Sequence, residues 1–525
     1  MLGLEMVVLL GVALVACGAL ARRYPIAPAI LLLLVGVLVG FAPHLREAQL
    51  PPEVVLLLFL PALLYWESLT TSLREIRNNL RVVVLTSTVL VVATAAAVAC
   101  AAHALGMHWG PAWVLGAALA PTDATAVGVL ARDLPRRTVT VLRAESLVND
   151  GTALVVYGLA VGVTVGEEQL TGWHVTWLLV LSYGGGVLAG IVVGLISWQV
   201  RGRMDDPILE GIAVLVTPFA AFLLADAIDA SGVLAVVCCG LFISQVTPRI
   251  TGAATRQLVL PFWALSTTVL SSALFVLVGL SAQSAFRDLT STSVRHALVI
   301  TVVVTAVVIG VRWLWTYTTP YVIRLLDRRP AQRLRRIGAR QRTVSATAGF
   351  RGAVSLAAVL AVPHKLDSGA PFPDRDVIVL VTCGVIVLTL LQAVPLPAVV
   401  RFARLPADNS VLEETQLAES YTLDAAIEAI DVTAAELGVG EPVVDRVRHD
   451  LDKQRKLAAA ASGAGDPVVQ HDDQYTSLSL ALIARRREAL LELRDEQRID
   501  DIVLRRVQAR LDIEEVRFSR AGLAE

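Results

Sequence analysis

The chain has 525 residues, of which 55% are hydrophobic and 17% are charged, and its mean hydropathy is +0.66. Soluble domains typically contain about 25% charged residues, so this composition excludes an ordinary soluble protein and indicates an integral membrane protein. The net charge of −1 conceals two regions of opposite charge.

Apolar runs close to the roughly 20 residues that cross a bilayer recur along the chain. We expect an all-α fold with about thirteen transmembrane helices, at residues 4–20, 25–42, 52–69, 81–102, 109–131, 138–163, 174–200, 207–226, 231–247, 258–281, 294–323, 343–363 and 376–400. The first run lacks a basic segment before it and a small-residue cleavage site, so we expect it to be retained rather than removed as a signal peptide.

The positions of Lys and Arg predict the orientation of these spans. With the N-terminus outside, 23 of the 30 basic residues before position 405 fall in inner connections, and five fall in outer connections. The remaining two, Arg312 and Arg351, lie within spans. The pattern predicts a multi-pass protein of the plasma (inner) membrane, with the N-terminus outside and the C-terminal tail in the cytoplasm.

Residues 405–525 differ in charge from the rest of the chain. They contain 25 acidic and 15 basic side chains, whereas residues 1–404 contain 21 acidic and 30 basic ones. Apolar residues at helical spacing, with a Gly/Ala/Pro break at 457–467, predict a helical cytoplasmic tail attached to a transmembrane domain of residues 1–404. The tail either aids assembly or regulates transport.

Two carboxylates lie inside successive apolar runs, Asp123 in the sequence APTDAT and Asp150 in ESLVNDG. A charged side chain near the bilayer centre costs roughly 2.5–3.5 kcal/mol even on lenient insertion scales. Such residues therefore usually face a cavity or a partner and mark an ion or proton path. The pattern predicts a cation/proton transporter.

The arrangement of the spans indicates an internal repeat. Spans 1–6 and 8–13 are related by an offset of seven, and an odd offset inverts one half relative to the other. Span 5 then corresponds to span 12, and these spans are interrupted at 120–123 and 348–352, in each case by Pro or Gly beside a charge. Paired interruptions in inverted repeats indicate a transport site near the midplane, formed by two broken, crossing helices.

The motifs along residues 1–404 resemble those of the bacterial sodium/proton antiporters in the electroneutral branch of the cation/proton antiporter superfamily (monovalent cation:proton antiporter family 1 type). The matching segments, in chain order, are FLPALL at 59–64 with ESL at 67–69, PTD at 121–123, ESLVND at 145–150, FW at 262–263 with FVLVGL at 275–280, and RGAVSL at 351–356. One position departs from the family pattern, because Ala124 stands where the family usually has Pro.

The chemistry of exchange identifies the central residue of the site. A sodium-sized cation requires oxygen ligands, and a carboxylate must release its proton before it binds the cation. We expect Asp150 to bind the cation and the proton in turn, since burial favours its neutral form. Ser146 lies four residues earlier on the same helical face. A permanently ion-paired, structural Asp150 is the alternative.

The resemblance implies further site residues. Na+ is expected to be held by Asp150, Ser146 and the carbonyl of Thr122, with contributions from Asp123 and Glu67. Two alternatives remain open: Glu67 is a carboxylate in a cytoplasmic funnel beside Arg74, and Asp123 holds the broken helix together.

Four more residues are expected to be structural. The resemblance implies that Asn149 steadies the crossing of the unwound segments. We expect a buried ion pair between Glu145 and Arg351, because a guanidinium in hydrocarbon requires a partner. We expect Arg312 to extend towards the inner interface instead.

The residues also bear on stoichiometry. Electrogenic relatives typically have a second Asp where this chain has Asn149, together with a lysine in the core. Lys365 is the only lysine before the tail, and arginine does not release its proton in proteins. We therefore expect electroneutral exchange of one Na+ or Li+ for one H+, serving pH and sodium homeostasis, with K+ as the alternative cation.

The resemblance implies a homodimer, in which spans 1–3 and 7–10 form the dimer layer and spans 4–6 and 11–13 form the core. We expect no cofactor and no nucleic-acid partner. An intramembrane aspartyl protease would need Gly-x-Gly-Asp and Tyr-Asp motifs, which neither Asp123 nor Asp150 shows. A cation channel would not require the paired interruptions.

Overall fold

The computed structural model describes residues 2–23, 28–42, 55–123, 136–166, 172–288, 291–326, 338–392, 394–405, 410–460, 467–498 and 500–521. These residues are almost entirely helical, with a single isolated β-bridge between Lys365 and Pro371. They form two compact units, 1–407 and 408–525, which are described separately.

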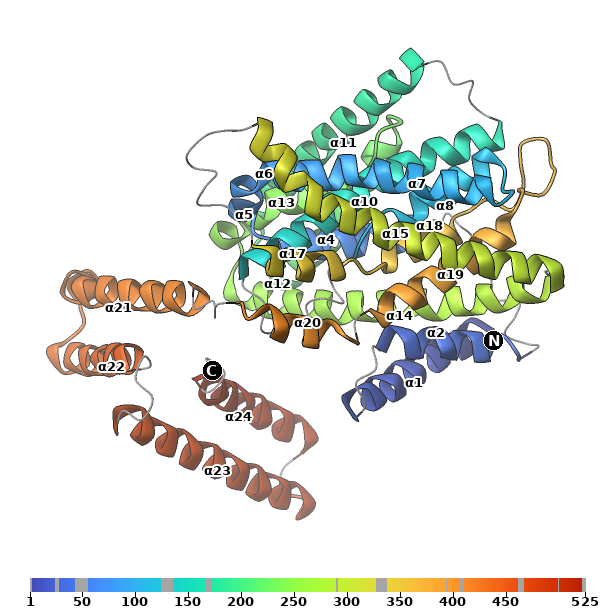
Figure 1. The fold of residues 1–525 in the computed structure, drawn as a ribbon. Helices are drawn as coiled ribbons and strands as arrows, with labels where there is room; N and C mark the ends of the chain where they lie inside the picture. The colour runs from blue at the N-terminus through green and yellow to red at the C-terminus, as the bar shows by residue number, and fades with distance from the viewer. Residues whose placement is uncertain are drawn as a thin grey trace. The chain divides into compact units, whose positions relative to one another are not determined.

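Short and bent helices form the first part of unit 1. Two of them, α6 and α7, are joined by a π-helical turn into one continuous helix, and Figure 1 shows all of them in blue. The elements are α1 (Leu2–Arg23), α2 (Pro28–Val39), η2 (Val55–Phe59), α4 (Leu60–Thr70), α5 (Leu73–Asn78), α6 (Leu80–Val84), η3 (Leu85–Leu90), α7 (Val91–Ala104) and α8 (Trp109–Leu119).

Long helices follow, with clear sequence signals at several of their ends. Asp206 accepts hydrogen bonds from the N–H groups of Ile208 and Leu209 and precedes Pro207, a good residue for a first helical turn. The six helices are α10 (Arg136–Val165), α11 (Gly172–Arg201), α12 (Pro207–Asp226), α13 (Gly232–Ile250), α14 (Ala253–Asp288) and α15 (Ser291–Leu326).

The last part of unit 1 contains the second interrupted region. Residues 348–352 separate two short helices, and a further bend of 42° separates the two helices that follow them. These elements are α17 (Ala339–Thr347), α18 (Ala353–Leu360), α19 (Arg375–Leu391) and α20 (Leu396–Ala403). The sequence predicts one continuous span at 376–400, so the bend before α20 is a difference from that expectation.

Within the described residues, seven helices are long and apolar enough to cross a membrane, or eight if the bent pair of α19 and α20 counts as one span. The apolar helices at Pro28–Val39 and Leu57–Thr70 are shorter. The membrane protein predicted from the composition is therefore confirmed at this level. The total of thirteen and the inverted repeat stay predictions, and residues 124–131 of predicted span 5 lie outside the described residues.

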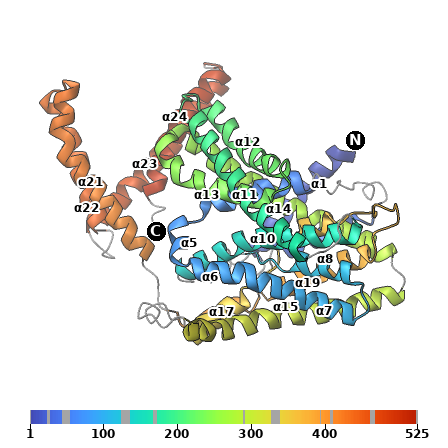
Figure 2. The same ribbon diagram turned by 90° about the horizontal axis from the view of Figure 1, so that it is seen from above.

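Two hydrophobic clusters fill unit 1. One includes residues of α2, α4 and α11–α13, and the other includes residues of α7, α8 and α15. Helices α10, α14, α18 and α19 contribute to both clusters. Figure 2 shows α11, α12 and α13 together on one side of this unit, with α7 and α15 on the other. Ala348 and Phe350 of the second interrupted region belong to the first cluster, whereas Leu119, directly before the first interruption, belongs to the second.

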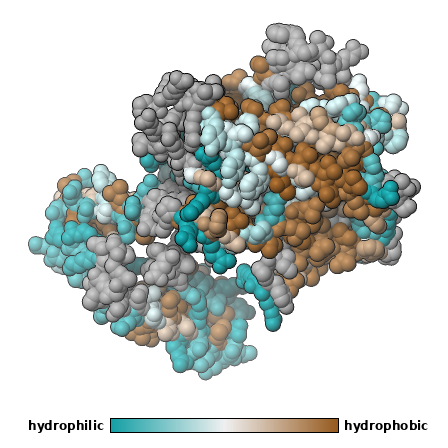
Figure 3. Space-filling view, in the orientation of Figure 1, coloured by the Kyte–Doolittle hydropathy of each residue, from teal (hydrophilic) through white to brown (hydrophobic). Residues whose placement is uncertain are grey.

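Glycines allow α2 and α14 to pack closely. A Cβ built on Gly36 would overlap the carbonyl of Val276, and one built on Gly279 would overlap the carbonyl of Leu33. Small residues at such crossings let helix backbones approach each other in a membrane. The outer surface is apolar as well: Figure 3 shows broad hydrophobic areas, and many large apolar side chains on α11 and α12 are exposed.

Unit 2 consists of α21 (Ser410–Leu437), α22 (Glu441–Ala460), α23 (Pro467–Asp495) and α24 (Asp501–Ala521). Gly438 ends α21 in the left-handed region, with φ of +65°, which glycine adopts without strain. Helices α23 and α24 share a small core of four buried residues, Ile483, Leu490, Leu504 and Leu511. The Gly/Ala/Pro break predicted at 457–467 falls where α22 ends and α23 begins.

Candidate functional site

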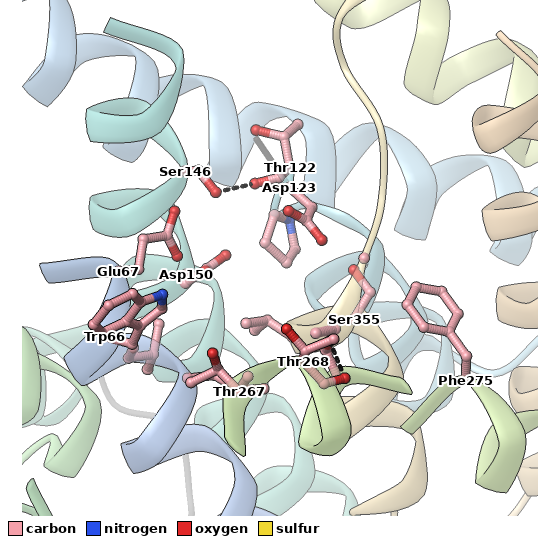
Figure 4. Close-up of a pocket in the computed structure, with 17 residues that line it drawn as sticks. Trp66, Glu67, Thr122, Asp123, Ser146, Asp150, Thr267, Thr268, Phe275 and Ser355 are labelled. Atoms are coloured by element: carbon pink, nitrogen blue, oxygen red, sulfur yellow. Dashed lines mark hydrogen bonds between the residues drawn. The ribbon is translucent and has the colours of Figure 1, made fainter. Parts of the chain in front are cut away.

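A cavity of about 280 Å³ lies against both interrupted regions of unit 1. Its walls come from α4, the segment after α8, α10, α14 and α18 (Figure 4). Nine of its lining side chains are acidic or carry a hydroxyl, namely Glu67, Thr122, Asp123, Ser146, Asp150, Thr267, Thr268, Ser271 and Ser355. No basic side chain is among the described residues that line it.

Asp150 and Ser146 reach this cavity from α10. Asp150 is only 4% exposed, and Ser146, one helical turn earlier, is 2% exposed. The Ser146 hydroxyl donates a hydrogen bond of 2.8 Å to the carbonyl oxygen of Thr122. That carbonyl belongs to the segment where α8 has ended, so the interruption places a backbone oxygen beside the two side chains.

Asp123 and Glu67 complete the acidic lining. Asp123 follows the end of α8, while Glu67 projects from α4, and both are half-buried. Figure 4 shows Glu67 beside Asp150, with Asp123 on the other side of the cavity. Arg74 is exposed and does not line the cavity, and no ion pair joins it to Glu67 in the described part of the chain. All five residues expected to bind the cation therefore meet in one place.

The two interrupted segments bind each other directly. The N–H of Asp123 donates to the carbonyl oxygen of Phe350 at 2.9 Å. Arg351 donates from Nε to the carbonyl of Leu119 at 2.9 Å and from Nη1 to the carbonyl of Gly349 at 2.6 Å. The C-terminal carbonyls of a helix lack intrahelical partners. Arg351 thus satisfies one of them at the end of α8 and joins the two breaks.

Asn149 binds the segment that follows α8. Its Nδ2 donates to Thr122 Oγ1 at 2.8 Å. Asn149 does not line the cavity. It lies with Glu145, Arg312 and Arg351 around a separate void of about 10 Å³. The four residues expected to be structural are therefore grouped together and separated from the carboxylates of the cavity.

The predicted ion pair between Glu145 and Arg351 is wrong, because Glu145 pairs with Arg312 instead. Glu145 Oε1 lies 2.7 Å from Nη1 of Arg312, and both side chains are less than 10% exposed. Arg312 also donates from Nε to the carbonyl of Ser345. Arg312 is therefore buried in the core rather than extended towards the interface. Arg351 finds backbone carbonyls instead, because the break in span 12 places unpaired carbonyls within its reach.

Sequence reasoning missed the wall formed by α14 and α18. Thr267, Thr268 and Ser271 line the cavity from α14, and Ser355 lines it from α18. Hydroxyls are common in membrane helices, where they bond the carbonyl four residues earlier, so they give little signal. The available clue was their clustering, since 266–272 contains five Ser or Thr residues in an otherwise apolar helix.

The lining favours a cation. Three carboxylates share a cavity that no described basic side chain lines, so bound positive charge, as a metal cation or a proton, stabilises them. In the described part of the chain, no three His, Cys, Asp or Glu side chains converge as a metal cluster. A cation here would therefore combine one carboxylate with hydroxyl and carbonyl oxygens, the ligands that hard cations prefer.

Comparisons with known proteins identify the family. A family model described as the transmembrane part of the sodium/hydrogen exchangers matches residues 9–401. An uncharacterised Na+/H+ exchanger of Mycobacterium tuberculosis is 44% identical over 528 residues, covering 100% of this chain and 97% of that protein. The Na+/H+ antiporter ApNhaP of Aphanothece halophytica is 30% identical over 366 residues, covering 69% and 66%.

The fold also resembles a solved structure. The sodium proton antiporter MjNhaP1 from Methanocaldococcus jannaschii superposes with a TM-score of 0.59 at 18% identity, covering 76% of this chain and 99% of that one. At this identity the likeness shows a shared fold.

Proposed function

The chain belongs to the sodium/hydrogen exchanger family, and we propose that it exchanges one Na+ or Li+ for one H+ at the cavity that contains Asp150. It is a multi-pass membrane protein and a secondary transporter rather than an enzyme. The observation that carries the proposal is the meeting of Asp150, Ser146 and the Thr122 carbonyl at the crossing of the two broken segments.

The proposed ligand set combines one charge with neutral oxygens. Asp150 supplies the carboxylate, while Ser146 and the carbonyl of Thr122 supply uncharged oxygens. The Thr122 carbonyl already accepts a hydrogen bond from the Ser146 hydroxyl, so these two oxygens are held together before the cation enters. Asp123 and Glu67, on opposite walls, attract the cation into the cavity and stabilise its positive charge.

Exchange follows from competition at Asp150. The deprotonated carboxylate binds the cation while the cavity faces one side of the membrane, and a proton displaces the cation on the other side. The cavity changes the side of the membrane that it faces only when a cation or a proton neutralises the Asp150 carboxylate, because an uncompensated charge is costly to bury. Each cycle therefore moves one cation in one direction and one proton in the other.

Electroneutrality is part of the proposal and rests on the residues around the smaller void next to the cavity. Asn149 carries no charge, and Arg312 and Arg351 stay protonated. Neither the amide nor the guanidinium groups can carry a second proton per cycle. Transport is then driven by the concentration gradients of the cation and the proton.

The finer arrangement is proposed on the same basis. The N-terminus lies outside and the tail in the cytoplasm of the plasma membrane, as the distribution of basic residues indicates. Two copies associate through the layer that includes α11, α12 and α14. The broad exposed apolar surface of α11 and α12 supports this choice.

Asp150→Asn tests the proposed function. The amide keeps the shape of the side chain but loses both the charge and the exchangeable proton, so sodium-driven proton movement in proteoliposomes is expected to disappear. Wild-type exchange is expected to have a bell-shaped pH dependence. Protons outcompete the cation at low pH, and they are too scarce to be carried back at high pH.

The same proteoliposomes test stoichiometry. With the voltage clamped by valinomycin and potassium, the steady-state sodium gradient reached at a fixed pH difference is expected not to change with voltage. Retention of wild-type exchange by Asp150→Asn would overturn the assignment of the site, and a voltage-dependent gradient would overturn the one-to-one ratio. Repeating the assay with Li+ and K+ distinguishes sodium exchange from the K+/H+ alternative.

A further inference from the structure

Ser355 has a position in the cavity that the proposed ligand set does not use. It lies in the first turn of α18, three residues after the break ends at Gly352, and it is 1% exposed. Ser355 lines the same cavity as Asp150 and Asp123, and Figure 4 shows it on the wall opposite Glu67 and Asp150.

The hydroxyl of Ser355 has no hydrogen-bond partner in the described structure. The hydroxyls of α14 differ in this respect, because Thr267, Thr268 and Ser271 each donate to a carbonyl of their own helix. A buried hydroxyl without a partner costs about 1–3 kcal/mol. This cost is offset if the partner is something that enters the cavity.

The surroundings of Ser355 restrict what that partner is. A Cβ built on Gly352 would overlap Asp123 Oδ2, so the start of α18 lies directly against the Asp123 carboxylate. The described lining contains carboxylates and no basic side chain. An anion would be repelled here, whereas a small cation would be attracted. A hydroxyl oxygen is a suitable ligand for such a cation.

We infer that Ser355 Oγ is an oxygen ligand of the transported cation and determines how tightly that cation is bound. The inference rests on the proposed function and extends its ligand set from the α10 wall to α18. With the cation bound, the lone pairs of Ser355 face it. With the cation absent, as in this structure, the hydroxyl has no partner.

Replacement of Ser355 tests this role. Ser355→Ala removes the hydroxyl oxygen that binds the cation. The apparent KM for Na+ is expected to rise about tenfold, with the maximal rate within about twofold of wild type. A tenfold change is at the low end of the effect of a hydrogen bond to a charged group. Ser355→Cys is expected to raise KM similarly, because sulfur keeps the size but is a poor ligand for a hard cation. Ser355→Thr retains the oxygen, and its KM is expected to stay close to that of wild type.

Ser272→Ala is the matched control. Ser272 is also a buried serine, 7% exposed, but it does not line the cavity. Its KM is expected to be unchanged. A second readout is the thermal stabilisation of the purified protein by NaCl, since the stabilisation of the folded state depends on the ratio of the ligand concentration to its Kd. The NaCl concentration needed for a given shift is expected to rise about tenfold in Ser355→Ala.

The outcomes separate the two proposals. If wild-type protein exchanges Na+ for H+ and both Ser355→Ala and Ser355→Cys keep wild-type KM values and NaCl stabilisation, the role of Ser355 is overturned while the exchange function stands. If the wild-type protein itself shows no exchange, the proposed function fails first. A higher KM in Ser272→Ala as well would show that packing, not ligation, causes the effect.

Discussion

Individual residues behind the cavity differ in how their charge is compensated. Arg351 is satisfied by the carbonyls of Leu119 and Gly349, whereas Arg312 depends on the carboxylate of Glu145. A carbonyl remains in place whatever side chains are changed, but a carboxylate can be removed by one substitution. The two arginines should therefore respond differently to mutation of Glu145.

We predict that Glu145→Gln destabilises the protein by about 3–5 kcal/mol, because it leaves Arg312 buried without a counter-charge. The double variant Glu145→Gln with Arg312→Gln should lose less stability than the sum of the losses in the two single variants, since it removes both charges together. Thermal unfolding in detergent measures these differences.

Arg203→Gln is the control for loss of a guanidinium, since Arg203 is exposed and should change stability by less than about 0.5 kcal/mol. Additive single effects at Glu145 and Arg312 would show that the two charges do not stabilise each other.

At the scale of elements, the crossing of the two breaks depends on close backbone contact. The N–H of Asp123 bonds the carbonyl of Phe350, and Gly352 then passes directly against the Asp123 side chain. The segments after α8 and before α18 can approach this closely only because position 352 has no Cβ. The geometry of the site therefore depends on a missing side chain as much as on those present.

Gly352→Ala is predicted to reduce exchange by about tenfold or more, because overpacking of this size typically costs about 1–3 kcal/mol and here displaces a lining carboxylate. Initial rates of sodium-driven proton movement in proteoliposomes measure the loss. Gly310→Ala on α15 is the matched control, since a Cβ there would meet nothing within 4 Å. Wild-type rates for Gly352→Ala would mean that the crossing tolerates separation of the two segments.

At the scale of the whole molecule, the two compact units divide the chain at residues 407 and 408. The cavity, both breaks and the Glu145–Arg312 pair all belong to the first unit. The second has its own small core between α23 and α24. Its acidic and basic side chains form exposed ion pairs such as Arg448 with Asp431, and pairs of this kind contribute little to stability.

Truncation after Ala407 is predicted to leave exchange intact, because no residue of the proposed site lies beyond it. The truncated protein should also remain a dimer, since the proposed contact layer is in unit 1. Exchange in proteoliposomes and mass measurement in mild detergent and in lipid nanodiscs test both points.

Loss of exchange in a correctly inserted truncation, or a truncated protein that is monomeric under conditions where the full chain is a dimer, would contradict this division of roles. A shifted pH optimum with exchange retained would identify the tail as a regulator.

Much of the fold could be predicted from the sequence because membrane insertion depends on local properties. Length, hydropathy and the position of charges mark helices such as α12 and α15 without knowledge of their neighbours. The helix breaks at Pro121 and Gly352 and the buried carboxylate Asp150 are local signals too, so the candidate site could be located before its geometry was known. The bend before α20 was missed, because the apolar run continues through it.

Contacts between residues that are far apart in the sequence could not be predicted in this way. Glu145 lies 167 positions before Arg312, and no local pattern distinguishes Arg312 from Arg351 as its partner. The free hydroxyl of Ser355 and the wall formed by Thr267 and Thr268 likewise depend on which face each helix turns towards the cavity. Local chemistry establishes which groups are costly to bury, whereas packing of distant helices selects the groups that compensate them.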